Sequence, residues 1–153
     1  MKPFKFKLQT SLDLRKRQED MQKLELAALT KEFQNKLAVL VEMRQQLKQL
    51  QDELRYHQGQ VIDLSQFKIW QEFVPVMNKK IMVQESLVEE SRQAMEQFRE
   101  VLLETVKARK ILEKLMVRYY EEYKREVLRE EQKQIDEMAT NAYLRNHDLA
   151  GGL

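Results

Sequence analysis

The sequence predicts an all-α protein in which two long helices fold back on each other as an antiparallel coiled coil. Its 153 residues include only 3 Gly and 2 Pro, well below the usual share, so the chain has few turns. Leu, Gln, Glu, Lys and Arg, which favour helices, dominate the rest. Apolar residues recur every seven positions, which indicates a left-handed coiled coil rather than disorder.

The first element, residues 1–7, is predicted to be an extended arm. Phe4, Phe6 and Leu8 alternate with Lys5 and Lys7, and a period of two is typical of an extended chain. We expect the two phenyl rings to lie against a partner or against a helix of the same chain.

Residues 8–60 are predicted to form the first long helix. Its seam, the line of residues that faces the partner helix, includes the polar Lys36, whose place we expect Leu37 to take. Leu12, Met21 and Leu24 follow an offset stripe, which predicts a break in the heptad near residues 21 to 26. The predicted seam consists of Leu26, Phe33, Leu40, Leu47, Leu54 and Val61, with Leu29, Lys36, Met43, Leu50 and His57 on its second line.

Residues 61–77 are predicted to form the bend, with a short helix inside it. Gly59 is a helix-stop signal, and Pro75 lacks the N–H donor that a helix interior requires. Four large apolar residues of the bend share roughly one helical face. Two interpretations stay open: the face packs against the end of the hairpin, or it is an exposed patch for a partner. The face consists of Phe67, Trp70, Phe73 and Met77.

Residues 78–146 are predicted to form the second long helix, followed by a frayed tail at 147–153. Many residues of its seam are small, so we expect only moderate stability from this half of the hairpin. The predicted seam consists of Leu87, Ser91, Ala94, Phe98, Val101, Thr105, Ala108, Leu112, Leu115 and Tyr119.

The length of the helices predicts the hairpin, as a single unit over residues 1–153. A helix of about 50 residues spans roughly 75 Å and cannot wrap a globular core, so it needs a partner helix along its length. The bend makes the two helices antiparallel. Because the second helix is longer, its end is expected to overhang or to pair with the arm.

Charge and composition argue against several functions. The 27 Lys and Arg nearly balance the 25 Asp and Glu, for a net charge of +2, which gives little reason to expect nucleic-acid binding. The chain has no Cys, which fits a reducing cytoplasm. No apolar run approaches the roughly 20 residues that span a bilayer, and the first residues lack the apolar core of a secretory signal. We therefore expect a cytoplasmic protein without membrane insertion.

The sequence carries no pattern of catalytic, cofactor-binding or metal-binding residues. The sequence has no Gly-rich phosphate-binding loop and no Cys nucleophile. It also has no Ser placed beside a His that could act as a base. His57 and His147 lie far apart along the chain and at opposite ends of the predicted hairpin. A two-helix hairpin has no water-poor pocket to raise the pKa of a carboxyl for acid–base work. The sequence predicts a protein that binds other proteins and is not an enzyme.

Both ends of the chain resemble the FliJ family, a soluble component of the bacterial flagellar type III export apparatus. The opening FKFKLQTSLDLRKRQED has the Phe-x-Phe-x-Leu-Gln start of that family. Residues 131–139 resemble its EQK-x-hydrophobic-DE-hydrophobic-A motif. The matching residues are Phe4, Phe6, Leu8, Gln9, Leu12, Leu14, Arg15 and Glu19 at the start, and Glu131, Gln132, Lys133, Ile135, Asp136, Glu137, Met138 and Ala139 near the end.

The resemblance implies a hairpin similar to the γ stalk of rotary ATPases, acting at the cytoplasmic face of the cell membrane at the flagellar base. It implies binding and stimulation of the export ATPase FliI with its regulator FliH, contact with the export gate protein FlhA, and escort of substrate chaperones. By analogy with rotary stalks, the ATPase surface would be Phe4, Phe6, Leu8, Gln132, Ile135, Asp136 and Glu137. The gate surface, joined to the aromatic face of the bend, would be Met43, Leu47, Leu50, Leu54, Trp70, Phe73 and Met77.

Two alternatives to this interpretation stay open. A structural coiled-coil adaptor, or the stalk protein of an injectisome-type secretion machine, would show a similar charge pattern. The seams would also allow either a monomeric hairpin or an open four-helix dimer.

Overall fold

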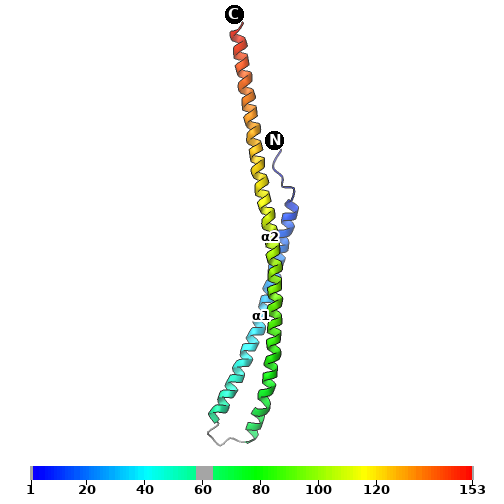
Figure 1. The fold of residues 1–153 in the computed structure, drawn as a ribbon, viewed down its shortest axis with the longest axis vertical. Helices are drawn as coiled ribbons and strands as arrows, with labels where there is room; N and C mark the ends of the chain where they lie inside the picture. The colour runs from blue at the N-terminus through cyan, green and yellow to red at the C-terminus, as the bar shows by residue number, and fades with distance from the viewer. Residues whose placement is uncertain (1, 58–63, 153) are drawn as a thin grey trace. The chain divides into compact units, whose positions relative to one another are not determined.

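The computed structural model describes residues 2–57 and 64–152, and two helices make up its regular structure (Figure 1). Helix α1 spans Gln9–His57 and helix α2 spans Leu64–Ala150. The described residues form no strand. The predicted all-α fold of two long helices that pack against each other is confirmed.

By contacts between residues, the chain divides into two compact units, where the sequence predicted one. Unit 1 combines Met1–Arg17 with Val106–Leu153, and unit 2 is Gln18–Thr105. Each unit therefore contains a part of α1 and a part of α2.

In unit 2 the two helices run antiparallel. Gln84 Nε2 donates a hydrogen bond of 2.9 Å to the backbone oxygen of Lys36, and Arg44 forms an ion pair of 2.8 Å with Glu85. Close by, Leu40, Met77 and Ile81 form a buried apolar cluster, and the partly buried Met43, Leu47 and Val88 pack against it.

The seam of α1 follows the predicted heptads. Every predicted seam residue from Leu26 to Leu54 is buried or half-buried, including Lys36. Leu37 does not replace Lys36, because it is exposed, while the Lys36 ammonium reaches out to Glu32 at 3.0 Å. Val61 and the side chain of His57 lie outside the described residues.

The predicted break near residues 21 to 26 is wrong, because the same heptad continues back to Leu12. Leu12, Glu19 and Leu26 are spaced by seven and are buried or half-buried, and Gln22 is half-buried on the second line. Met21 and Leu24 are instead 71% and 74% exposed. An uninterrupted helix keeps one face toward its partner, so polar side chains enter the seam here. The ion pair between Glu19 and Lys23, at 2.8 Å, helps to compensate the buried carboxylate.

Residues 64–77 belong to α2, so the predicted short helix in a bend at 61–77 and the start of the second helix at 78 are corrected. Pro75 lies inside α2, although a proline in a helix interior costs about 3 kcal/mol. Burial offsets this cost, since Trp70, Val74 and Met77 around Pro75 are half-buried or buried. Residues 61–63 lie outside the described part of the chain. At its other end α2 continues to Ala150 instead of ending at residue 146.

Part of the predicted seam of α2 is one residue out of place. Ser91, Phe98, Thr105 and Leu112 are buried or half-buried as predicted. On the second line the residue four positions on, not three, faces α1, so the larger Met95 and Leu102 take the places predicted for Ala94 and Val101. Ala108 and Leu115 are half-buried, whereas Leu87, Ala94, Val101 and Tyr119 are exposed. The second line consists of Val88, Met95, Leu102, Arg109 and Met116.

Candidate protein-binding surfaces

The arm, residues 2–8, lies against α2 through five aromatic residues that we call the aromatic clasp. The Phe4 ring meets Tyr120 edge-on, with centroids 5.2 Å apart, and lies 5.6 Å from Tyr123. Phe6 lies 6.1 Å from Tyr119 and is only 8% exposed. The arm thus packs on a helix of its own chain, one of the two partners that the alternating pattern allowed.

Hydrogen bonds fix the backbone of the arm at both of its ends. The Tyr123 hydroxyl donates to the backbone oxygen of Lys2 at 3.0 Å, and the backbone N–H of Gln9 donates to the oxygen of Phe6 at 3.1 Å. The Lys124 ammonium lies 4.5 Å from the centre of the Tyr120 ring, within the range of a cation–π interaction. A shallow hollow of about 430 Å³ lies beside the clasp.

Beyond the clasp, α2 continues without a covering element, and its far end extends past the arm in Figure 1. All residues from 128 to 150 are exposed. Six of them are large and apolar, which is unusual for a helix that is solvated on all sides. They are Leu128, Ile135, Met138, Tyr143, Leu144 and Leu149.

In unit 2, an apolar groove of about 380 Å³ runs along α2 beside α1. Val76 and Val83, spaced by seven and exposed, line it together with Met43 of α1. Lys79 and Lys80 also line it, and such side chains present aliphatic stems to an apolar surface and keep the ammonium groups in water.

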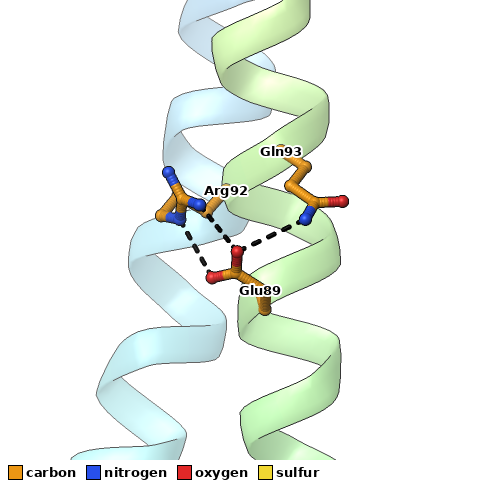
Figure 2. A network of polar contacts seen from close by, with 3 residues as sticks. All are labelled: Glu89, Arg92 and Gln93. Atoms are coloured by element: carbon orange, nitrogen blue, oxygen red, sulfur yellow. Dashed lines mark hydrogen bonds and ion pairs between the residues drawn. The ribbon is translucent and has the colours of Figure 1, made fainter.

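The middle of α2 carries a network of polar contacts on its surface, which Figure 2 shows. Both Glu89 carboxylate oxygens accept hydrogen bonds from the Arg92 guanidinium, at 2.6 and 2.9 Å. Gln93 Nε2 donates to one of them at 3.4 Å. The hydrogen bonds from Arg92 hold the pKa of Glu89 below its ordinary value and raise the pKa of Arg92. Contacts of this kind stabilise an exposed helix and are no sign of catalysis.

The described residues show no cluster of metal-binding side chains. Within 2–57 and 64–152, no group of three or more His, Cys, Asp or Glu gathers around a common point. In the same ranges, neither helix has an apolar stretch that could cross a bilayer.

A comparison with protein families decides the assignment. The model of the family described as "Flagellar FliJ protein" matches residues 4–148. The chain belongs to the FliJ family. It is therefore a protein of the flagellar export apparatus. No curated protein and no solved structure matches it.

The residues predicted as the ATPase surface of this FliJ family member fall into two groups, both in unit 1. Phe4 and Phe6 are engaged in the clasp, so their rings are half-buried and buried. The remaining five are exposed, and Gln132 Nε2 donates a hydrogen bond of 2.9 Å to Asp136. The exposed five are Leu8, Gln132, Ile135, Asp136 and Glu137.

The residues predicted as the gate surface lie mostly in the seam of unit 2. Met77 is buried in the apolar cluster with Leu40, and Trp70 is half-buried. Only Phe73 is exposed, at 46%. The aromatic face of residues 67–77 is thus divided, because Trp70 and Met77 face the seam while Phe67 and Phe73 face outward. The half-buried seam residues of α1 in this set are Met43, Leu47, Leu50 and Leu54.

The predicted gate surface did not include the groove residues Val76 and Val83. The signal that could have found them is the spacing by seven of Ile69, Val76 and Val83. Because a bend was predicted at residues 61–77, Ile69 and Val76 were not treated as part of the same helix as Val83, and the shared spacing was not recognised.

Proposed function

We propose that this FliJ family member is a non-enzymatic stalk of the flagellar export apparatus that binds and stimulates the export ATPase. Family membership over residues 4–148 supports the apparatus. The observation that carries the stalk role is the exposed end of α2, which contains the family-like 131–139 motif and is left uncovered beside the arm. A solvated helix end with apolar residues fits insertion into a ring that surrounds it.

The proposed ATPase surface consists of the end of α2 and the exposed side of the arm. Ile135 supplies apolar area, and Asp136 and Glu137 supply negative charge beside it. Lys5 and Lys7 are exposed on the arm. Phe4 and Phe6 have a positioning role in this proposal, because their rings hold the arm on α2 and leave its lysines free to meet a partner.

The proposed contact with the export gate protein FlhA uses unit 2. Phe73 and the groove at Val76 and Val83 present apolar area in the part of the chain that the gate surface was predicted to occupy. The seam residues Met43, Leu47 and Met77 support the shape of this surface from below. We also propose that the protein binds the FliI–FliH complex, escorts substrate chaperones and works at the cytoplasmic face of the membrane. These roles rest on the family resemblance.

The ATPase rate of purified FliI tests the stalk role. Adding this protein over a range of concentrations is expected to raise the rate to a plateau. The variant Ile135→Glu is expected to reduce the stimulation at least tenfold, whereas Ile111→Glu, at an exposed position of the same helix, leaves it unchanged. An ATPase rate that does not respond to the protein at any concentration would overturn the proposal.

Binding to FlhA tests the gate contact separately. Val83→Glu and Phe73→Ala are expected to weaken binding to the cytoplasmic part of FlhA, with helicity unchanged by circular dichroism. Met82→Glu, whose exposed side chain neighbours Val83 but does not line the groove, is the matched control. Equal binding by Val83→Glu and the control variant would contradict a groove contact.

A further inference from the structure

The exposed end of α2 carries one continuous line of residues at alternating steps of three and four. We call this line the terminal stripe. Such spacing places side chains on a single helix face and is the pattern of a coiled-coil seam. All seven members are exposed, and Met138 near the middle is 67% exposed. The terminal stripe consists of Leu128, Glu131, Ile135, Met138, Ala142, Arg145 and Leu149.

The terminal stripe is not a continuation of the seam that faces α1. Extending the seam from Leu112 and Met116 by heptads leads to the polar residues Glu130, Lys133 and Glu137, with Leu144 as a single apolar residue further on. The apolar line turns away to a different face of the helix. A helix extending along the α1 side would therefore meet charges, and the stripe requires a partner of its own.

The borders of the terminal stripe carry few charges, although 34% of the whole chain is charged. Amide and small side chains lie on both sides of the stripe, and Asp148 is the one charged residue that borders it. Other charged residues of this segment, such as Arg129, Lys133 and Asp136, lie on the opposite face. Depletion of charge around an apolar centre distinguishes interface cores from ordinary surface. The bordering residues are Gln132, Gln134, Ala139, Asn141, Asn146 and Asp148.

The positions of the two charged residues in the terminal stripe indicate which partner packs on it. Glu131 and Arg145 each lie seven residues from Met138, one on either side. We propose that a second copy of this chain packs antiparallel on the terminal stripe and forms a two-fold symmetric dimer. This arrangement sets Glu131 of each copy beside Arg145 of the other. A parallel pair would set Glu131 beside Glu131 and Arg145 beside Arg145, and like charges oppose that pairing.

The dimer is a weak and reversible one. A single helix face of this length buries less than the roughly 1,600 Å² of a standard stable interface. The stripe includes Ile135, and Gln132 borders it, so a second copy covers part of the proposed ATPase surface and competes with the ATPase for it. Self-association goes beyond the proposed function and does not rest on it, because it is measured on this protein alone.

Sedimentation equilibrium of the full chain over a range of concentrations tests the dimer. The unaltered protein is expected to shift from monomer to dimer as its concentration rises, and Met138→Glu is expected to stay monomeric. Leu144→Glu is the matched control, since Leu144 is exposed on the other side of the same segment, and it is expected to dimerise normally. A monomer at every concentration, or equal dimerisation of Met138→Glu and the control, overturns the proposal. Circular dichroism checks that the variants keep their helicity.

Charge reversal tests the antiparallel orientation. Glu131→Arg and Arg145→Glu are each expected to weaken the dimer at least tenfold, because each sets like charges together at both ends. The double variant is expected to restore the affinity, since it exchanges the two charges. If the double variant stays as weak as the single ones, the antiparallel dimer is overturned.

Discussion

Phe4 packs edge-on against Tyr120, with ring centroids 5.2 Å apart and ring planes at 66°. The two residues belong to the arm and to α2, far apart in the sequence. The positive edge of one ring meets the negative face of the other, a geometry that stabilises aromatic pairs beyond their buried area. This contact and its neighbours turn an arm without regular structure into an ordered part of unit 1.

The variant Phe6→Ala is expected to loosen the arm. Loss of the buried ring and of its contact with Tyr119 removes about 2 kcal/mol, which corresponds to roughly thirtyfold in an equilibrium constant. Hydrogen exchange at the Gln9 amide, which is bonded to the Phe6 oxygen, is expected to accelerate accordingly. Leu14→Ala, at a position exposed on the same unit, serves as the control. Unchanged exchange in Phe6→Ala would contradict the clasp.

The variant Gln22→Leu is expected to stabilise the protein. Gln22 is half-buried in the seam, and its side-chain oxygen is buried with no hydrogen-bond partner among the described residues. Removing such a buried acceptor is expected to raise the free energy of unfolding by about 1 to 2 kcal/mol, as measured by urea denaturation. Leu24→Gln, on the exposed side of α1, should change it by less than about 0.5 kcal/mol. The opposite order of effects would support the break in the heptad that the sequence predicted.

The variant Pro75→Ala is expected to raise the stability of α2. Alanine supplies the missing N–H donor and removes the clash of the proline ring with the preceding turn, an effect of up to about 3 kcal/mol. Thermal unfolding followed by circular dichroism measures it. A loss of stability would indicate that residues around Pro75 prefer a bend to the continuous helix.

The carboxyl of Glu89 is expected to titrate below the ordinary range of glutamate. Its pKa is lowered in the folded protein by the hydrogen bonds from Arg92. The contribution of this contact to stability is therefore complete at neutral pH and is lost as the pH falls through the lowered pKa. Carbon-13 NMR titration measures the pKa directly, and Arg92→Gln is expected to raise it. Identical titration curves in the two proteins would show that the hydrogen bonds in Figure 2 do not persist in solution.

The sequence by itself determined the helical class, the heptad of α1 from Leu26 onward and the family-like motifs at both ends. These features are local, because they follow from helix propensity and from the spacing of large apolar residues such as Leu40. Both can be recognised in the sequence of one helix without reference to the helix that packs against it. The alternation of Phe4 and Phe6 with lysines also predicted an arm whose rings pack against a helix or a partner protein.

Only the tertiary structure decided which neighbouring residue faces the partner helix. Positions three and four residues on from Ser91 both lie near the seam, and packing on α1 selected Met95 over Ala94. Packing between the two helices also keeps Glu19 in the seam and leaves Met21 exposed, although the apolar character of the two side chains alone predicts the reverse. It also carries α2 through Pro75, because burial of Met77 and its neighbours outweighs a backbone cost that local rules treat as a helix boundary. Local preferences differ by a few kcal/mol, and the shared interface of two helices is large enough to overrule them.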